Sequence, residues 1–164
     1  SYQELAEQFL GHLQDGITVE GMYADPDLKA QQHPSEISPE MLSQVAQVIQ
    51  QVRWDKQDIA NFLGCYLSEP KPHIFFDAPE PEISVAKFKQ ALLKRGVQLN
   101  LTSQMLCHDC WIFINGETHQ PDPLNYSLLR DLADKRVLSG LPDVSPELVT
   151  LLYQWYQDGY ISPV

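Results

Sequence analysis

The 164-residue sequence lacks features that would assign it to several large classes of protein. No apolar run approaches the roughly 18 residues of a membrane-spanning helix. The first residues carry Glu4 and Glu7 in a helical pattern, without the basic and apolar stretches of a secretory signal. Three cysteines, an odd number in a chain of this length, do not form a disulfide framework. We therefore expect a cytoplasmic protein with no membrane partner.

Positive charge is also scarce. The sequence has 11 Lys and Arg against 22 Asp and Glu, a net charge of −11. Residues 1–81 hold 4 basic and 13 acidic side chains, a net of −9, and residues 82–164 hold 7 and 9, a net of −2. Nucleic-acid backbones require clustered Lys and Arg. The composition therefore disfavours nucleic acid as a partner.

Recognisable catalytic motifs are missing. The sequence contains no P-loop, no G-x-G-x-x-G and no G-x-S-x-G. Iron(II) oxygenases bind their metal through two His and a carboxylate, often arranged as His-x-Asp along a strand. None of the five histidines is followed two residues later by Asp or Glu. We therefore assign no catalytic, metal-binding or cofactor-binding residue to this chain.

The segment Cys107-His108-Asp109-Cys110 is the one stretch that resembles a metal or redox site. We place His108 and Asp109 as a two-residue loop between two short strands, with Cys107 and Cys110 opposite each other. A structural zinc site needs four ligands, and a redox C-x-x-C is favoured at a helix N-terminus. The sequence therefore predicts an ordinary turn, and a zinc-bound module is the weaker alternative.

The first half of the sequence is typical of amphipathic helices. Apolar residues recur at helical spacing in residues 2–13, 39–52 and 56–67, and Ser38 and Asp55 are natural N-caps for the second and third of these segments. Residues 15–37 have little periodicity and predict a long irregular loop. We expect residues 1–70 to form a helical region, followed by a proline-rich linker at 71–81.

The second half, residues 82–164, alternates helices with short strands. Ser84, Asp122 and Ser145 open predicted helices, and residues 97–102 alternate apolar and polar side chains as in a half-buried strand. Asn115-Gly116 is typical of a hairpin turn. A small antiparallel sheet among three helices predicts a winged-helix-like domain. The fold class is thus mainly α with a small antiparallel sheet (α+β).

These pieces, in this order, resemble the C-terminal part of bacterial JmjC-type cupin ribosomal oxygenases, which hydroxylate an arginine of a large-subunit ribosomal protein. The most specific landmarks are Tyr23-Ala-Asp25-Pro26-Asp27 followed by His33-Pro34, and the turn Asn115-Gly116-Glu117. The resemblance covers essentially the whole chain. None of these landmarks is a catalytic signature.

The resemblance implies that a catalytic cupin barrel precedes this region in the parent protein and holds Fe(II) and 2-oxoglutarate. No residue here matches the family's iron ligands, so none is carried over, and we expect no cofactor in this chain. The resemblance also assigns a helical dimerisation region to roughly residues 1–70. A ribosomal protein would be the substrate of the parent.

We therefore expect the non-catalytic C-terminal portion of an Fe(II)/2-oxoglutarate-dependent protein hydroxylase, which serves dimerisation and substrate docking. The alternative is a stand-alone winged-helix regulator or adaptor that binds nucleic acid or protein. We expect a homodimer whose interface draws on apolar residues of the three N-terminal helices, namely Phe9, Leu10, Leu13, Val45, Ile49, Phe62, Leu63 and Tyr66.

Overall fold

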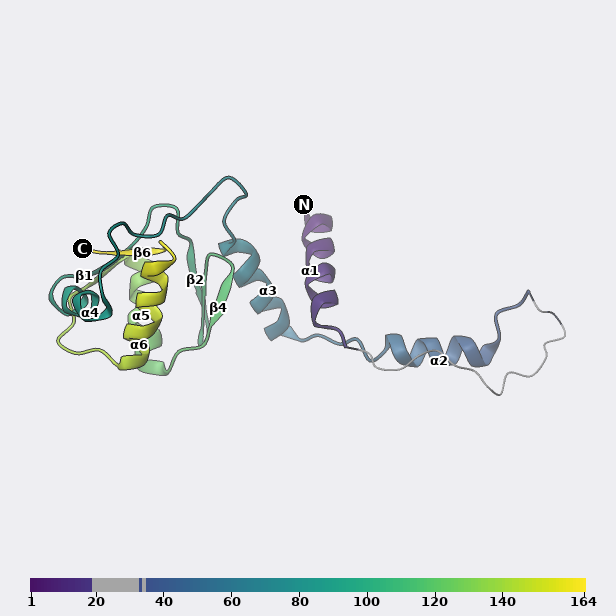
Figure 1. The fold of residues 1–164 in the computed structure, drawn as a ribbon. Coiled ribbons are helices and arrows are strands. Elements are labelled where there is room, and N and C mark those ends of the chain that lie inside the picture. Colours follow the sequence, from purple (N-terminus) through teal and green to yellow (C-terminus); the bar gives the residue numbers. More distant parts are fainter. Residues whose placement is uncertain (19–32, 34) are drawn as a thin grey trace. The chain divides into compact units, whose positions relative to one another are not determined.

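A computed structural model describes residues 1–18, 33 and 35–164 of the chain (Figure 1). The described residues divide into two compact units, Ser1–Ile59 and Ala60–Val164. Most of the predicted irregular loop 15–37, including Tyr23, Asp25 and Asp27, lies outside the described residues. The proline-rich segment 71–81, which the sequence suggested as a linker, lies within the second unit.

The first unit contains α1 (Tyr2–Gly16), α2 (Pro39–Ile49) and the start of α3 (Lys56–Ser68). The predicted caps begin two of these helices. Ser38 accepts a hydrogen bond from the Met41 amide at 3.0 Å, and Asp55 accepts one from the Gln57 amide at 2.7 Å. Each cap satisfies an amide that would otherwise have no partner in the first turn of a helix.

The second unit is an α+β domain whose strands form two three-stranded antiparallel sheets within the described chain. One sheet has the order β5-β1-β6, from Val137–Ser139, Gly96–Leu99 and Ile161–Pro163. The other has the order β2-β3-β4, from Met105–His108, Trp111–Ile114 and Glu117–His119. The sequence predicted one small sheet, and the division into two is a finding of the structure.

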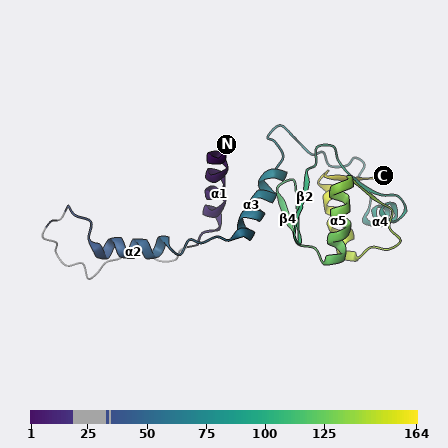
Figure 2. The same cartoon turned by 180° about the vertical axis from the view of Figure 1, so that it is seen from behind.

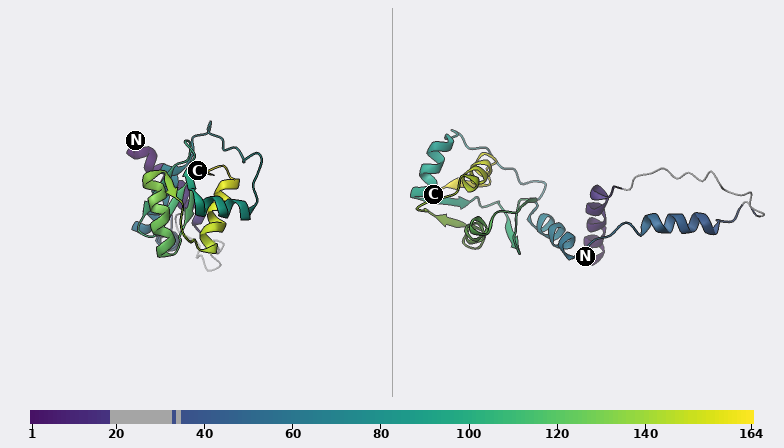
Figure 3. Two further views of the ribbon diagram at one scale, coloured as in Figure 1. Left: turned by 90° about the vertical axis from the view of Figure 1, so that its left-hand side faces the viewer. Right: turned by 90° about the horizontal axis from the view of Figure 1, so that it is seen from below.

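Three helices pack around these strands: α4 (Val85–Lys94), α5 (Pro123–Lys135) and α6 (Pro146–Gln157) (Figure 3). The caps Ser84, Asp122 and Ser145 are confirmed by side-chain hydrogen bonds to first-turn amides. The core is apolar and continuous, and its largest fully buried side chains include Trp155, Phe88, Leu92, Ile112 and Leu152. The hydrophobic effect of this burial holds the domain together.

Two details of the predicted strands are corrected. The strand expected over residues 97–102 ends at Leu99, and Leu101 is 97% exposed although it was expected on the buried face.

The hairpin turn at Asn115-Gly116 is confirmed, because both residues have positive φ, 49° and 90°, as a type I′ turn requires.

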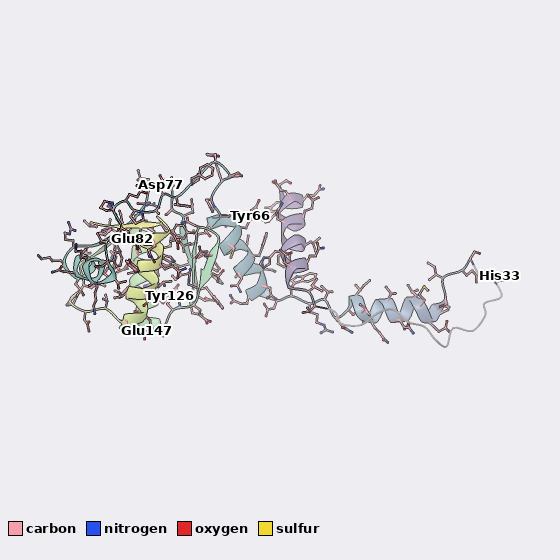
Figure 4. The ribbon with its side chains drawn as sticks, in the orientation of Figure 1. His33, Tyr66, Asp77, Glu82, Tyr126 and Glu147 are labelled. Carbon is pink, nitrogen blue, oxygen red and sulfur yellow. The ribbon has the colours of Figure 1, made fainter. Side chains whose placement is uncertain are left out.

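The proline-rich segment after α3 is fixed to the rest of the second unit. The rings of Phe76 and Tyr160 meet edge to face with centroids 4.8 Å apart. The Tyr153 hydroxyl donates to Glu82 Oε1 at 2.8 Å, and the Ile83 amide donates to the Tyr156 hydroxyl at 3.1 Å. Asp77 of this segment and Glu82, which directly follows it, are labelled in Figure 4. The segment and the residues that directly follow it are therefore part of the packing of the second unit.

Candidate functional site

The most unusual feature of the first unit is that neither α1 nor α2 contains a buried residue. On α2, Leu42, Val45 and Ile49 are 64%, 42% and 64% exposed. Their spacing of three and four residues places them on one face of the helix. An exposed apolar stripe on a helix is typical of a surface that another protein covers.

Helix α1 has a similar but less exposed stripe. Phe9 is half-buried and meets Trp54 edge to face, with ring centroids 5.9 Å apart. Leu13 is half-buried, and Leu10 is 59% exposed. The predicted interface residues of α1 and α2 thus all retain exposed apolar surface.

The other three predicted interface residues, Phe62, Leu63 and Tyr66, belong to the second unit. Phe62 is only 5% exposed and its ring stacks on Tyr66 with centroids 5.4 Å apart. Leu63 and Tyr66 are half-buried. A substitution at Phe62 would therefore disturb packing within the chain, and α2 offers cleaner positions for testing self-association.

The Cys107–Cys110 stretch forms the predicted turn, but its register differs from the expectation. Cys107 pairs with Ile112 and His108 pairs with Trp111, so the two loop residues are Asp109 and Cys110. Cys107 and Cys110 are therefore not opposite each other. Among the described residues, no group of three or more His, Cys, Asp or Glu side chains is arranged to hold a metal ion.

Strand β2 and helix α5 lie next to each other and pack together (Figure 2). A groove of about 410 Å³ lies between them. We call it the β2–α5 groove. Strand β2 and the turn after it form one wall, and α5, with Tyr126 labelled in Figure 4, forms the other. Its lining residues are Met105, Leu106, Cys107, His108, Asp109, Tyr126, Arg130, Ala133 and Asp134.

The groove combines an apolar floor with charged walls. Met105 is buried, and Cys107 is half-buried, whereas Asp109, Arg130 and Asp134 are exposed. Burial raises the pKa of the Cys107 thiol, and the nearby Asp134 carboxylate raises it further. A thiol with a raised pKa is a poor nucleophile at neutral pH.

A second polar cluster, which the sequence analysis did not predict, joins β4 to the end of α6. The Tyr160 hydroxyl donates to Glu117 Oε1 at 2.7 Å, and His119 Nε2 lies 3.4 Å from Glu117 Oε2. The imidazole of His119 meets Trp155 edge to face, with centroids 5.2 Å apart. Burial lowers the pKa of His119 and raises that of Tyr160. In the sequence, the one sign that Glu117 and His119 share a face of a strand is their spacing of two residues in Glu-Thr-His.

A family model for the ROXA-like winged helix matches residues 51–162. The chain belongs to the ROXA-like winged-helix family. The match includes α3, the proline-rich segment, strands β1 to β5 and the first two residues of β6. The expected winged-helix fold is therefore confirmed. The comparison with curated proteins finds no match for the chain.

Solved structures of one bacterial protein resemble the ROXA-like chain over nearly its whole length. The structure of YcfD, a ribosomal oxygenase from Escherichia coli, has a TM-score of 0.73 and 18% identity, covering 99% of this chain and 46% of YcfD. Another YcfD structure has a TM-score of 0.70 and 20% identity, covering 99% and 44%. A third, in complex with cobalt and 2-oxoglutarate, has a TM-score of 0.72 and 18% identity, covering 99% and 46%.

At these identities the likeness establishes the fold. The ROXA-like chain spans less than half the length of the YcfD structures. The resemblance to ribosomal oxygenases is thus confirmed at the level of the C-terminal region. Across the residues that the structure describes, no helix is both long and apolar enough to span a membrane.

Proposed function

We propose that this chain is the non-catalytic C-terminal portion of an Fe(II)/2-oxoglutarate-dependent ribosomal protein hydroxylase. Its first unit serves self-association and its winged-helix unit serves substrate docking. The catalytic chemistry belongs to a part of the protein outside this chain. The likeness to the C-terminal part of YcfD supports the proposal, as does the lack of any metal-holding group among the described residues.

The observation that carries the self-association role is the apolar stripe of α2, on a helix with no buried residue. In a dimer with a two-fold axis, the apolar stripe of α2 would be buried on both copies of the chain. The chain would thereby remove from water the apolar surface that its own packing leaves exposed.

The alternative of a nucleic-acid reader has little support in α5 and α6, although α4 carries three Lys and no acidic residue. Helix α6 has no Lys or Arg. On α5, Lys135 forms an ion pair with Asp131 at 3.2 Å. A protein partner fits this acidic surface better than a phosphate backbone does.

The test is a pair of matched substitutions on α2. Ile49→Asp places a charge on the apolar stripe, and Gln47→Asp places the same charge on the opposite face of the same helix. Fully burying an Ile side chain stabilises by about 1.5–3 kcal/mol. Because Ile49 is 64% exposed, its loss from both copies should cost about 2–4 kcal/mol, which is roughly a 30- to 700-fold rise in the dimer Kd.

Dimer dissociation is measured by dilution, with light scattering after size-exclusion chromatography. The proposal expects Ile49→Asp to weaken the dimer and Gln47→Asp to leave it close to the unmodified chain. Equal behaviour of the two variants would show that this face of α2 is not the interface.

A further inference from the structure

Strand β2 is an edge strand of the sheet β2-β3-β4, and all four of its residues, Met105–His108, line the β2–α5 groove. The Asn115 amide donates to the Gln104 carbonyl, so these two opposed residues form a hydrogen-bonded pair. Residues of an antiparallel strand alternate between hydrogen-bonded and non-hydrogen-bonded pairs. Met105 and Cys107, which oppose Ile114 and Ile112, therefore turn their backbone N–H and C=O groups away from β3.

No other element within residues 35–164 forms a backbone hydrogen bond to these outward groups of Met105 and Cys107. A row of free N–H and C=O groups on an edge strand is a template for a further strand. Extended peptides use such edges for affinity and use adjacent pockets to bind alternate side chains. The 410 Å³ groove supplies such a pocket directly beside the edge.

The charged side chains that line the groove indicate which class of ligand it can bind. Asp109 and Asp134 place two carboxylates on the lining, against the single guanidinium of Arg130. The Asp134 carboxylate acts more strongly on the Cys107 thiol than Arg130 does. The surrounding unit is acidic too, because residues 60–164 carry 8 Lys and Arg against 12 Asp and Glu, a net of −4. The groove is thus complementary to positive charge.

We propose that the β2–α5 groove binds an extended, basic segment of a partner protein. The segment adds as a strand to the free edge of β2 and places a Lys or Arg side chain beside Asp109 and Asp134. Its apolar side chains contact the floor at Met105 and Cys107, which share one face of β2. This inference rests on the docking role proposed above and gives that role a surface and a class of partner.

The test is a titration of the ¹⁵N-labelled chain with short synthetic peptides, followed by NMR. The basic probe is acetyl-Val-Arg-Val-Arg-Val-amide, and the matched acidic probe replaces both Arg with Glu. A third probe keeps the basic side chains but carries N-methyl groups on alternate backbone amides, which removes the donors that a strand needs. The binding site is read from the amide signals of Met105 and Cys107.

The proposal expects saturable shifts at β2 with the basic probe and little change with the acidic or N-methylated probe. Asp109→Asn with Asp134→Asn should weaken the basic probe's binding about three- to tenfold, since exposed charge pairs contribute modestly. Both side chains are exposed, so neither substitution removes core packing. Arg130→Gln should leave binding equal or tighten it.

Equal binding of the acidic or N-methylated probe would overturn the proposal, as would shifts confined to other elements. Shifts at β2 that depend on chain concentration without peptide would identify a second copy as the occupant and would also overturn it. Binding of a basic ribosomal protein that the double substitution leaves unchanged would place docking elsewhere. That result would reject the groove but leave the proposed function standing.

Discussion

Gly64 on α3 is the position where one added methyl group should have the most informative effect. A Cβ built at Gly64 would lie 2.4 Å from Cδ1 and Cγ of the Phe113 ring. Carbon atoms pack at about 3.5–4.0 Å. Phe113 is 1% exposed on β3, so its ring has no free space into which it can move. Gly64→Ala therefore forces α3 and β3 apart.

The expected magnitude combines two opposing contributions. Replacing Gly with Ala inside a helix ordinarily stabilises by about 1 kcal/mol. Overpacking a filled core costs typically about 1–3 kcal/mol and occasionally more. With a clash of more than 1 Å against an immobile ring, we expect an overpacking cost in the upper part of this range, about 2–3 kcal/mol, and hence a net loss of about 1–2 kcal/mol. For a domain of this size, that corresponds to a fall in Tm of roughly 4–16 °C.

Gly11→Ala on α1 is the matched control, because no atom lies within 4 Å of a Cβ at Gly11. Only the helix-propensity gain applies there, so this variant should be neutral or slightly more stable. Chemical denaturation of both variants and the unmodified chain, followed by circular dichroism, gives the comparison. A Gly64→Ala variant as stable as the unmodified chain would refute the close packing of α3 on β3.

Other predictions address the turn, the polar cluster and the cysteines. Asn115→Ala should destabilise the second unit by about 1–3 kcal/mol in urea titrations, since it leaves the Gln104 amide, now bonded to Asn115 Oδ1 at 2.9 Å, without its acceptor. Asn115→Asp keeps the acceptor and should lose less. Burial holds the pKa of His119 below its ordinary 6.5, so the unfolded chain binds this proton first as pH falls. Stability should then decrease below about pH 6.5, and His119→Gln should flatten that decrease; an unchanged slope would remove His119 as its source. Adding a chelator should leave the Tm of the unmodified chain unchanged, and likewise the Tm of the Cys107→Ser/Cys110→Ser variant. A fall in Tm that occurs only in the unmodified chain would show that the two cysteines bind a metal.

The local features of the fold were predictable because they depend on neighbouring residues. N-caps such as Ser38 and Ser145 determine where helices begin, and the Asn115-Gly116 turn determines where β3 ends. In each case the physical cause lies within a few residues of the element it explains.

The features that were missed depend on tertiary pairing. Strand β5 has three residues and exists through its pairing with β1, where Val97 opposes Leu138. The turn after β2 was predicted one residue too early, so the expected partner of Cys107 was Cys110, whereas its actual partner is Ile112. The β2–α5 groove joins Asp109 and Asp134, which are 25 residues apart and meet only when α5 packs on β2.

The central claim is that the helical first unit associates with a second copy of the chain, and sedimentation equilibrium of the unmodified 164-residue chain tests it most directly. We predict a mass of twice 18.7 kDa at a concentration of tens of micromolar, falling toward 18.7 kDa on dilution. A mass of 18.7 kDa at every concentration up to that range would contradict it.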